Sequence, residues 1–147
     1  MPEISRSALV PYTTEQMYVL VDGISAYPEF LPWCSQAQEL SRSDDSVKAC
    51  VEIAKGSVKK SFTTMNKMQP GSVIEMNLVD GPFKRLHGYW RFEQLKPGAC
   101  KVSLDLEFEF SNKLMALAIG SVFNQVANTL VDSFVGRARA VYGAGTA

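Results

Sequence analysis

The sequence contains little of what metal binding and acid–base catalysis need. Among its 147 residues there is one histidine, His87, and the three cysteines, Cys34, Cys50 and Cys100, are far apart. Standard zinc sites combine closely spaced cysteine and histidine ligands, often as CxxC, so no zinc site can be assembled from these residues. An odd number of distant cysteines is typical of reduced thiols in a cytoplasmic protein. We therefore expect no metal and no disulfide framework.

The sequence also lacks an excess of charge of either sign. Lysine plus arginine and aspartate plus glutamate number 15 each, so no overall charge attracts the protein to DNA or to a membrane. The N-terminal residues show no secretory signal pattern. Residues 114–131 carry no charge and approach the length of a membrane span. Polar residues from Ser121 to Arg139 nevertheless follow one helical stripe, which is typical of a helix that lies on a sheet. We expect a cytoplasmic protein and leave open a peripheral position at the inner membrane face.

What is present is a regular alternation of apolar and polar residues. This alternation predicts strands at residues 4–10, 47–53, 58–68, 73–79, 88–95 and 102–110, separated by turns rich in proline and glycine. Thr13 and Gln16 form a capping box that predicts a helix from Thr14 to Val21. Asn112 can cap a final helix that extends to about Tyr142.

The order of these elements predicts an α+β protein with a mostly antiparallel sheet. Consecutive strands joined by short turns favour a meander, and the apolar face of the sheet needs a cover, which the long helix supplies. The length of 147 residues suits one domain, residues 1–147, with residues 143–147 as a flexible tail.

Residues 26–34, AYPEFLPWC, combine features that rarely occur together. Two prolines four residues apart exclude a regular helix or a central strand. The segment nevertheless carries four large apolar side chains, Tyr27, Phe30, Leu31 and Trp33. These side chains must be buried by the core of the protein, by an apolar ligand or by a partner. We expect the segment to lie between the short helix and the first sheet strand that follows it.

Four strings of residues carry a resemblance to a known family. They are LVD at 20–22, YPEFLPWC at 27–34, SFTT at 61–64, and DGPFKRL at 80–86 followed by Gly88, Trp90 and Phe92. The chain resembles the coenzyme Q-binding START-like family, which is grouped with polyketide cyclase-like proteins and includes the bacterial ribosome association toxin branch. The resemblance implies a helix-grip fold, as in START and birch-allergen-like domains. In that fold a curved antiparallel sheet of about six to seven strands wraps around one long C-terminal helix, and two short helices follow the first strand.

The resemblance implies a carrier rather than an enzyme, and it supports two functions. The first is the binding of ubiquinone or another polyprenyl lipid between sheet and helix, in support of respiratory electron transport, with no catalytic cofactor. The alternative is a toxin-like factor that binds the large ribosomal subunit and blocks its association with the small one. We take ligand binding as the leading hypothesis.

Inward-facing aromatic and methionine side chains are the candidates for a ligand site. From periodicity alone they form either a solid core or the lining of an apolar pocket. The candidate ligand-binding residues are Tyr27, Phe30, Leu31, Trp33, Phe62, Met76, Phe83, Trp90, Phe92, Phe108, Phe123 and Phe134.

The sequence offers no readable catalytic constellation, which makes a polyketide-type cyclase the weakest hypothesis. His87 is expected at the start of a strand, as a surface or loop-edge residue without a base role. Asp105 and the acidic residues that alternate with the apolar positions after it should face water, and Arg6 and Arg91 are expected to pair with them across strands. That pairing would place Leu9 on the inner face.

Two features suggest contacts with a partner. The segment from Asp80 to Leu86 places apolar and cationic side chains together, which suits either a lid with peripheral membrane contact or an ordinary turn. Residues 54–74 contain four lysines and no acidic residue, which suits contact with phosphates of lipid or ribosomal RNA. The candidate partner or phosphate contacts are Lys55, Lys59, Lys60, Lys67, Lys84 and Arg85.

Overall fold

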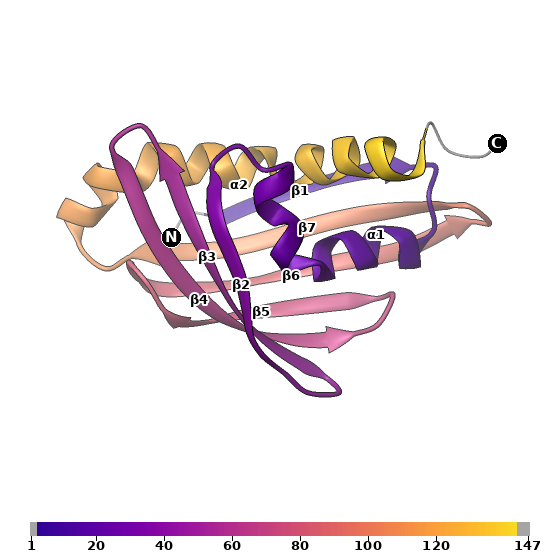
Figure 1. Ribbon diagram of the computed structural model, residues 1–147, viewed down its shortest axis with the longest axis horizontal. Coiled ribbons are helices and arrows are strands. Elements are labelled where there is room, and N and C mark those ends of the chain that lie inside the picture. The colour runs from indigo at the N-terminus through magenta and orange to yellow at the C-terminus, as the bar shows by residue number, and fades with distance from the viewer. Residues whose placement is uncertain (1–2, 144–147) are drawn as a thin grey trace.

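One seven-stranded antiparallel sheet wraps around a single long helix in the computed structural model, which describes residues 3–143 (Figure 1). The elements in chain order are β1 (Glu3–Val10), α1 (Thr14–Asp22), the 3-10 helix η1 (Ile24–Glu29), β2 (Cys34–Arg42), β3 (Ser46–Lys55), β4 (Val58–Gln69), β5 (Val73–Asp80), β6 (Phe83–Lys96), β7 (Ala99–Phe110) and α2 (Lys113–Tyr142). This is the expected helix-grip architecture, including the two short helices after the first strand.

Strands β2 to β7 form an antiparallel meander, and the first strand, β1, pairs with the last strand, β7, at one edge of the sheet. Its order is β1-β7-β6-β5-β4-β3-β2, and the paired strands are antiparallel. Two predictions about strands were wrong. Strand β2 was missed, and β6 begins at Phe83 rather than at Gly88. Residues 80–86 are therefore not a loop, because only Gly81 and Pro82 separate β5 from β6.

The facing predicted for β1 was also wrong. Ile4 and Val10 are buried, whereas Leu9 is 71% exposed. Arg6 shares the face of Ile4, and its Nη2 donates a hydrogen bond of 2.6 Å to Asn128 Oδ1 on α2. The anchor of the strand on its outer face is Ser5, whose hydroxyl donates to Asp105 Oδ1 at 2.7 Å. Arg6 therefore joins the edge strand to the helix instead of pairing with an acid.

Both helices begin as the sequence predicts. Thr13 Oγ1 accepts from the backbone N–H of Gln16 at 3.1 Å, and Gln16 Oε1 accepts from the backbone N–H of Thr13 at 2.8 Å. Asn112 Oδ1 accepts from the backbone N–H of Met115 at 2.8 Å. These bonds satisfy backbone donors that have no partner within the first helical turn.

Helix α2 is long and apolar enough to cross a membrane by length and composition. Its apolar residues form part of the protein core instead, because Phe123, Val131 and Phe134 are buried against the concave face of the sheet. The first two turns differ, since Leu114 and Leu117 are 77% and 85% exposed. The helix ends at Tyr142 and is capped by Gly143, whose carbonyl oxygen accepts a hydrogen bond from the Tyr12 hydroxyl. The other four residues of the expected tail, 144–147, lie outside the described residues.

The large apolar side chains of residues 26–34 pack against the core of the protein itself. A short 3-10 helix accommodates Pro28, and the Tyr27 hydroxyl donates to the carbonyl oxygen of Val21. Leu31 is fully buried, and the Trp33 carbonyl accepts from the backbone N–H of Ala54 at 2.7 Å, which fastens the segment to β3. The segment thus lies between α1 and β2, in the expected position (Figure 1).

Candidate functional site

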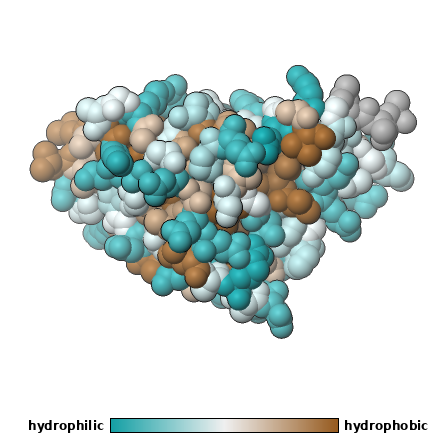
Figure 2. Space-filling view, in the orientation of Figure 1, coloured by the Kyte–Doolittle hydropathy of each residue, from teal (hydrophilic) through white to brown (hydrophobic). Residues whose placement is uncertain are grey.

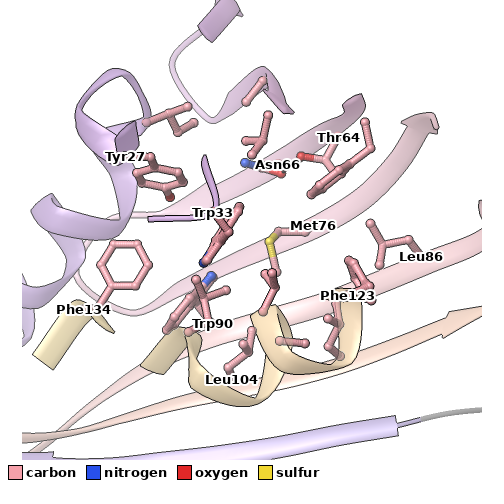
Figure 3. Close-up of a pocket in the computed structure, with 18 residues that line it drawn as sticks. Tyr27, Trp33, Thr64, Asn66, Met76, Leu86, Trp90, Leu104, Phe123 and Phe134 are labelled. Carbon is pink, nitrogen blue, oxygen red and sulfur yellow. Dashed lines mark hydrogen bonds between the residues drawn. The ribbon is translucent and has the colours of Figure 1, made fainter. Parts of the chain in front are cut away.

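A small apolar cavity lies between the concave face of the sheet and α2 (Figure 3). Its volume is about 90 Å³, which is near the size of a single ring and far below the roughly 300–1,000 Å³ of typical ligand pockets. Residues from η1, β3, β4, β5, β6, β7 and α2 meet at this cavity. Seven predicted ligand-binding residues line it: Tyr27, Trp33, Phe62, Met76, Trp90, Phe123 and Phe134.

The other five predicted ligand-binding residues belong to the core around the cavity. They are Phe30, Leu31, Phe83, Phe92 and Phe108. Phe108, for example, is fully buried, and its ring centroid is 4.7 Å from that of Phe123. Aromatic packing of this kind fills most of the hollow with side chains. Both interpretations of the inward-facing residues therefore hold in part. Some of these residues line a pocket, and the others form a solid core around it.

Two polar residues on β4 line the cavity and were missed. Thr64 and Asn66 are each 7% exposed, and Thr64 Oγ1 donates a hydrogen bond of 2.8 Å to Asn66 Oδ1. Thr64 and Asn66 share one face of the strand with Phe62 and Met68, at every second position. Period-2 facing was therefore the available signal that they point inward.

The cavity contains no acid–base pair. Tyr27 carries the only titratable side chain among the described residues that line it, and burial raises the pKa of that phenol well above its usual range. His87 lies outside the cavity, where its Nε2 is 2.9 Å from Glu75 Oε2. The hydrogen bond from His87 is the largest influence that lowers the pKa of the Glu75 carboxyl. Within residues 3–143, no cluster of histidine, cysteine, aspartate or glutamate suits a metal ion.

Of the two alternatives for Asp80 to Leu86, a lid with membrane contact and an ordinary turn, the structure favours the turn. Phe83 and Leu86 are each 6% exposed and belong to the core, and Phe83 stacks on Phe110 with ring centroids 5.4 Å apart. The charged residues of this segment, Asp80, Lys84 and Arg85, face water, and Lys84 Nζ is 3.7 Å from Glu109 Oε2. The apolar rings of residues 80–86 are therefore not available to enter a bilayer.

The four lysines between residues 54 and 74 do not form one patch. Lys67 is directly opposite Glu75 on the neighbouring strand, and its charge contributes to lowering the pKa of that carboxyl. Lys55, Lys59 and Lys60 lie at the β3–β4 turn, at the other end of β4. The β5–β6 turn with Lys84 and Arg85 and the start of α2 lie at this same end (Figure 1). We call Lys55, Lys59, Lys60, Lys84 and Arg85 the basic end.

Two of the three thiols are protected by burial. Cys34 is 5% exposed and Cys100 is fully buried, and in both cases burial is the main cause that raises the pKa of the thiol to about 11. At pH 8 such a thiol is ionised to only about 0.1%, and the thiolate is the reactive form. Cys50 is half-buried.

We therefore expect one thiol, Cys50, to react rapidly with a disulfide reagent such as dithionitrobenzoate at pH 8. Cys34 and Cys100 should react only after denaturation, because both access and ionisation are suppressed. The measurement is the number of thiols titrated before and after addition of guanidinium. The variant Cys50→Ser should abolish the rapid phase. Three thiols reacting at similar rates in the native protein would contradict the burial described above.

A curved sheet that grips one helix over an apolar cavity defines the class of START-like, helix-grip proteins. This class is confirmed by the sequence itself. Residues 10–135 match the family model described as polyketide cyclase/dehydrase and lipid transport, and the chain belongs to that family.

Several curated relatives of nearly half identity carry the name ribosome association toxin RatA. The protein of Pseudomonas aeruginosa is 48% identical over 140 residues, which cover 95% of this chain and 97% of the relative. That of Escherichia coli is 47% identical over 98% of this chain and 91% of the relative. The mitochondrial coenzyme Q-binding protein COQ10 homolog B of Xenopus laevis is more distant, at 27% identity over 96% of this chain and 59% of that protein. The names of the RatA relatives describe a toxin of ribosome association.

Solved structures confirm the fold. The Zhui aromatase/cyclase from Streptomyces superimposes with a TM-score of 0.84 over 99% of both chains, at 12% identity. An 18 kDa protein from Caulobacter crescentus has a TM-score of 0.75 at 29% identity, and the match covers 98% of this chain and all of the other. The first of these similarities carries the fold alone, because a shared fold does not imply a shared activity.

Proposed function

We propose that the protein binds the large ribosomal subunit and blocks its association with the small subunit. The observation that carries this proposal is the identity of 47–49% with ribosome association toxins over 95–98% of the chain. This function was the alternative hypothesis from the sequence, and the comparisons favour it over respiratory ubiquinone transport. A ribosomal partner also supports a cytoplasmic location.

The basic end is the surface that we propose for the ribosomal contact. Lys59, Lys60 and Arg85 are exposed, and the hairpin that carries the lysines projects beyond the body of the sheet (Figure 1). Lysine and arginine bind nucleic acid chiefly through its phosphates, with release of counterions. The neutral total charge hides this local concentration of cations.

An exposed apolar patch adjoins the basic end. Leu114 and Leu117 project from the first turns of α2, where Figure 2 shows brown side chains at the left end of the molecule. Lys60 lines one surface depression together with Ile119 and Val122 of the same helix, so the β3–β4 hairpin and the start of α2 lie side by side. Apolar side chains rimmed by cations suit a partner that presents both protein and phosphate groups, as a ribosomal subunit does.

Charge reversal at the hairpin is the test of this surface. The double variant Lys59→Glu and Lys60→Glu is expected to weaken binding to purified large subunits by about tenfold or more, because it replaces two phosphate contacts by repulsion. In sucrose gradients, excess wild-type protein should decrease the associated 70S peak, and the double variant should leave that peak close to its level without protein.

The matched control is Lys96→Glu with Lys101→Glu, which makes the same change in charge near the β6–β7 turn, at the opposite end of the sheet. This control should behave as wild type. Equal loss in both double variants would indicate a general effect of charge. An unchanged 70S peak with excess wild-type protein would contradict the proposed function itself.

We propose ligand binding in the cavity as a second function. Its support is the cavity between sheet and α2 and the lipid transport description of the family. Ubiquinone is the narrower version of this proposal, and its support is the distant coenzyme Q-binding relative. A volume of about 90 Å³ accepts a ring-sized group, so a polyprenyl tail would require α2 or residues 24–34 to move away from the sheet.

A further inference from the structure

One buried hydrogen-bond donor in the cavity has no acceptor. Trp33 is 9% exposed, and its indole Nε1 is buried without a hydrogen-bond partner within the part of the chain that the structure describes. An indole N–H can only donate, and buried tryptophan N–H groups almost always find a partner. Because Trp33 lines the cavity, the acceptor can come from a molecule that enters it.

Two other side chains that line the cavity, Trp90 and Asn66, also present hydrogen-bond donors. In Figure 3 the indole nitrogens of Trp33 and Trp90 are directed toward each other, and two donors cannot bond to one another. Asn66 Oδ1 accepts from the hydroxyl of Thr64, and the NH₂ group of the same amide is a further donor on the wall of the cavity. The polar part of the lining therefore offers donors to a ligand.

The same lining disfavours other polar ligands. A hydroxyl or an amine needs an acceptor for its own proton, and the acceptors here, Asn66 Oδ1 and the Tyr27 oxygen, already take part in hydrogen bonds with Thr64 and Val21, whereas the Trp33 N–H has no bond at all. A carboxylate would need a cation, and the described residues that line the cavity include no lysine, arginine or histidine. The group that fits best is uncharged, accepts hydrogen bonds and is attached to an apolar ring.

We propose that the cavity binds a ring-sized, uncharged carbonyl compound whose oxygen accepts a hydrogen bond from Trp33 Nε1. This proposal rests on the ligand-binding function proposed above and names the chemistry of the ligand. The carbonyl oxygen has two lone pairs, so it can accept from Trp33 and from a second donor at the same time. The ring is held by the apolar wall that Met76, Leu104 and Phe123 provide.

Two probes of nearly equal shape test the proposal. Cyclohexanone carries the carbonyl, and methylenecyclohexane replaces its oxygen by a CH₂ group. Because the chain has only two tryptophans, a ¹⁵N–¹H spectrum contains two indole signals, which the variants Trp33→Phe and Trp90→Phe assign. Cyclohexanone is expected to move the Trp33 indole proton downfield. Methylenecyclohexane should perturb the cavity methyl groups without that downfield shift.

The affinity of the two probes gives an independent readout. Trp33→Phe is expected to weaken cyclohexanone binding by about fivefold to tenfold, the loss typical of one neutral hydrogen bond, and to change methylenecyclohexane binding by less than about twofold. If Trp33→Phe does not fold, the shift of the indole proton in the wild-type protein decides alone.

The outcomes separate this proposal from the function on which it rests. If neither probe perturbs the cavity residues, ligand binding in the cavity is wrong. If both probes bind but the Trp33 indole proton stays in place and Trp33→Phe weakens both equally, ligand binding stands and the carbonyl proposal is overturned.

Discussion

Replacing Phe134 by alanine is expected to lower the free energy of unfolding by about 3–5 kcal/mol. Phe134 lies on α2 and is 1% exposed. Its ring makes edge-to-face contacts with Tyr27, Phe30 and Trp90 at centroid distances of 5.4, 5.2 and 5.2 Å. The side chain therefore joins the helix to residues 26–34 and to the centre of the sheet, and these rigid groups cannot close the hole that its removal leaves.

Urea denaturation followed by tryptophan fluorescence measures this loss. The control is Leu117→Ala on the same helix, where the side chain is 85% exposed and truncation should change stability by about 0.5 kcal/mol or less. A loss of 3–5 kcal/mol is a large part of the roughly 5–15 kcal/mol that a domain of this size has in total. A cost for Phe134→Ala as small as that of the control would show that α2 is not held to the sheet through this ring.

The elements that the sequence predicted are those whose pattern is local. The capping box at Thr13 and the alternation in β7 depend only on neighbouring residues, and both were confirmed. Strand β2 was missed because it lies at the sheet edge, where most of its residues are exposed and no alternation appears. In β6, an irregularity between Phe83 and Arg85 leaves both Lys84 and Arg85 exposed, which interrupts the period of two and hides the start of the strand.

The site was less predictable because it depends on distances between elements. Phe108 and Trp90 look alike in the sequence, since both are inward aromatic residues on strands. Only the packing of α2 decides that Trp90 lines the cavity while Phe108 is covered by Phe123. Arg6 shows the same limit, because its partner Asn128 is 122 residues away on α2.

The second large effect on stability is expected at Gly88, where alanine would add one methyl group. Gly88 lies in β6 between Met76 on β5 and Leu106 on β7. A Cβ atom there would lie 2.7 Å from the carbonyl oxygen of Asp105 and 2.8 Å from Leu106 Cδ1. The leucine can adjust, but the carbonyl belongs to the neighbouring strand. We expect Gly88→Ala to destabilise the protein by about 1–3 kcal/mol through overpacking.

The expected loss of stability is a sharp test, because a glycine-to-alanine change usually has the opposite sign. In a strand or helix interior, alanine is normally more favourable than glycine by about 0.5–1 kcal/mol. The matched control is Gly136→Ala in α2, where a Cβ would meet nothing within 4 Å, so it should stabilise by about 0.5–1 kcal/mol. Both variants are compared by urea denaturation. Stabilisation by Gly88→Ala would mean that β6 and β7 do not approach as closely as described. The cavity wall that Leu106 forms beside Gly88 would then lie farther out, with room for a ligand larger than one ring.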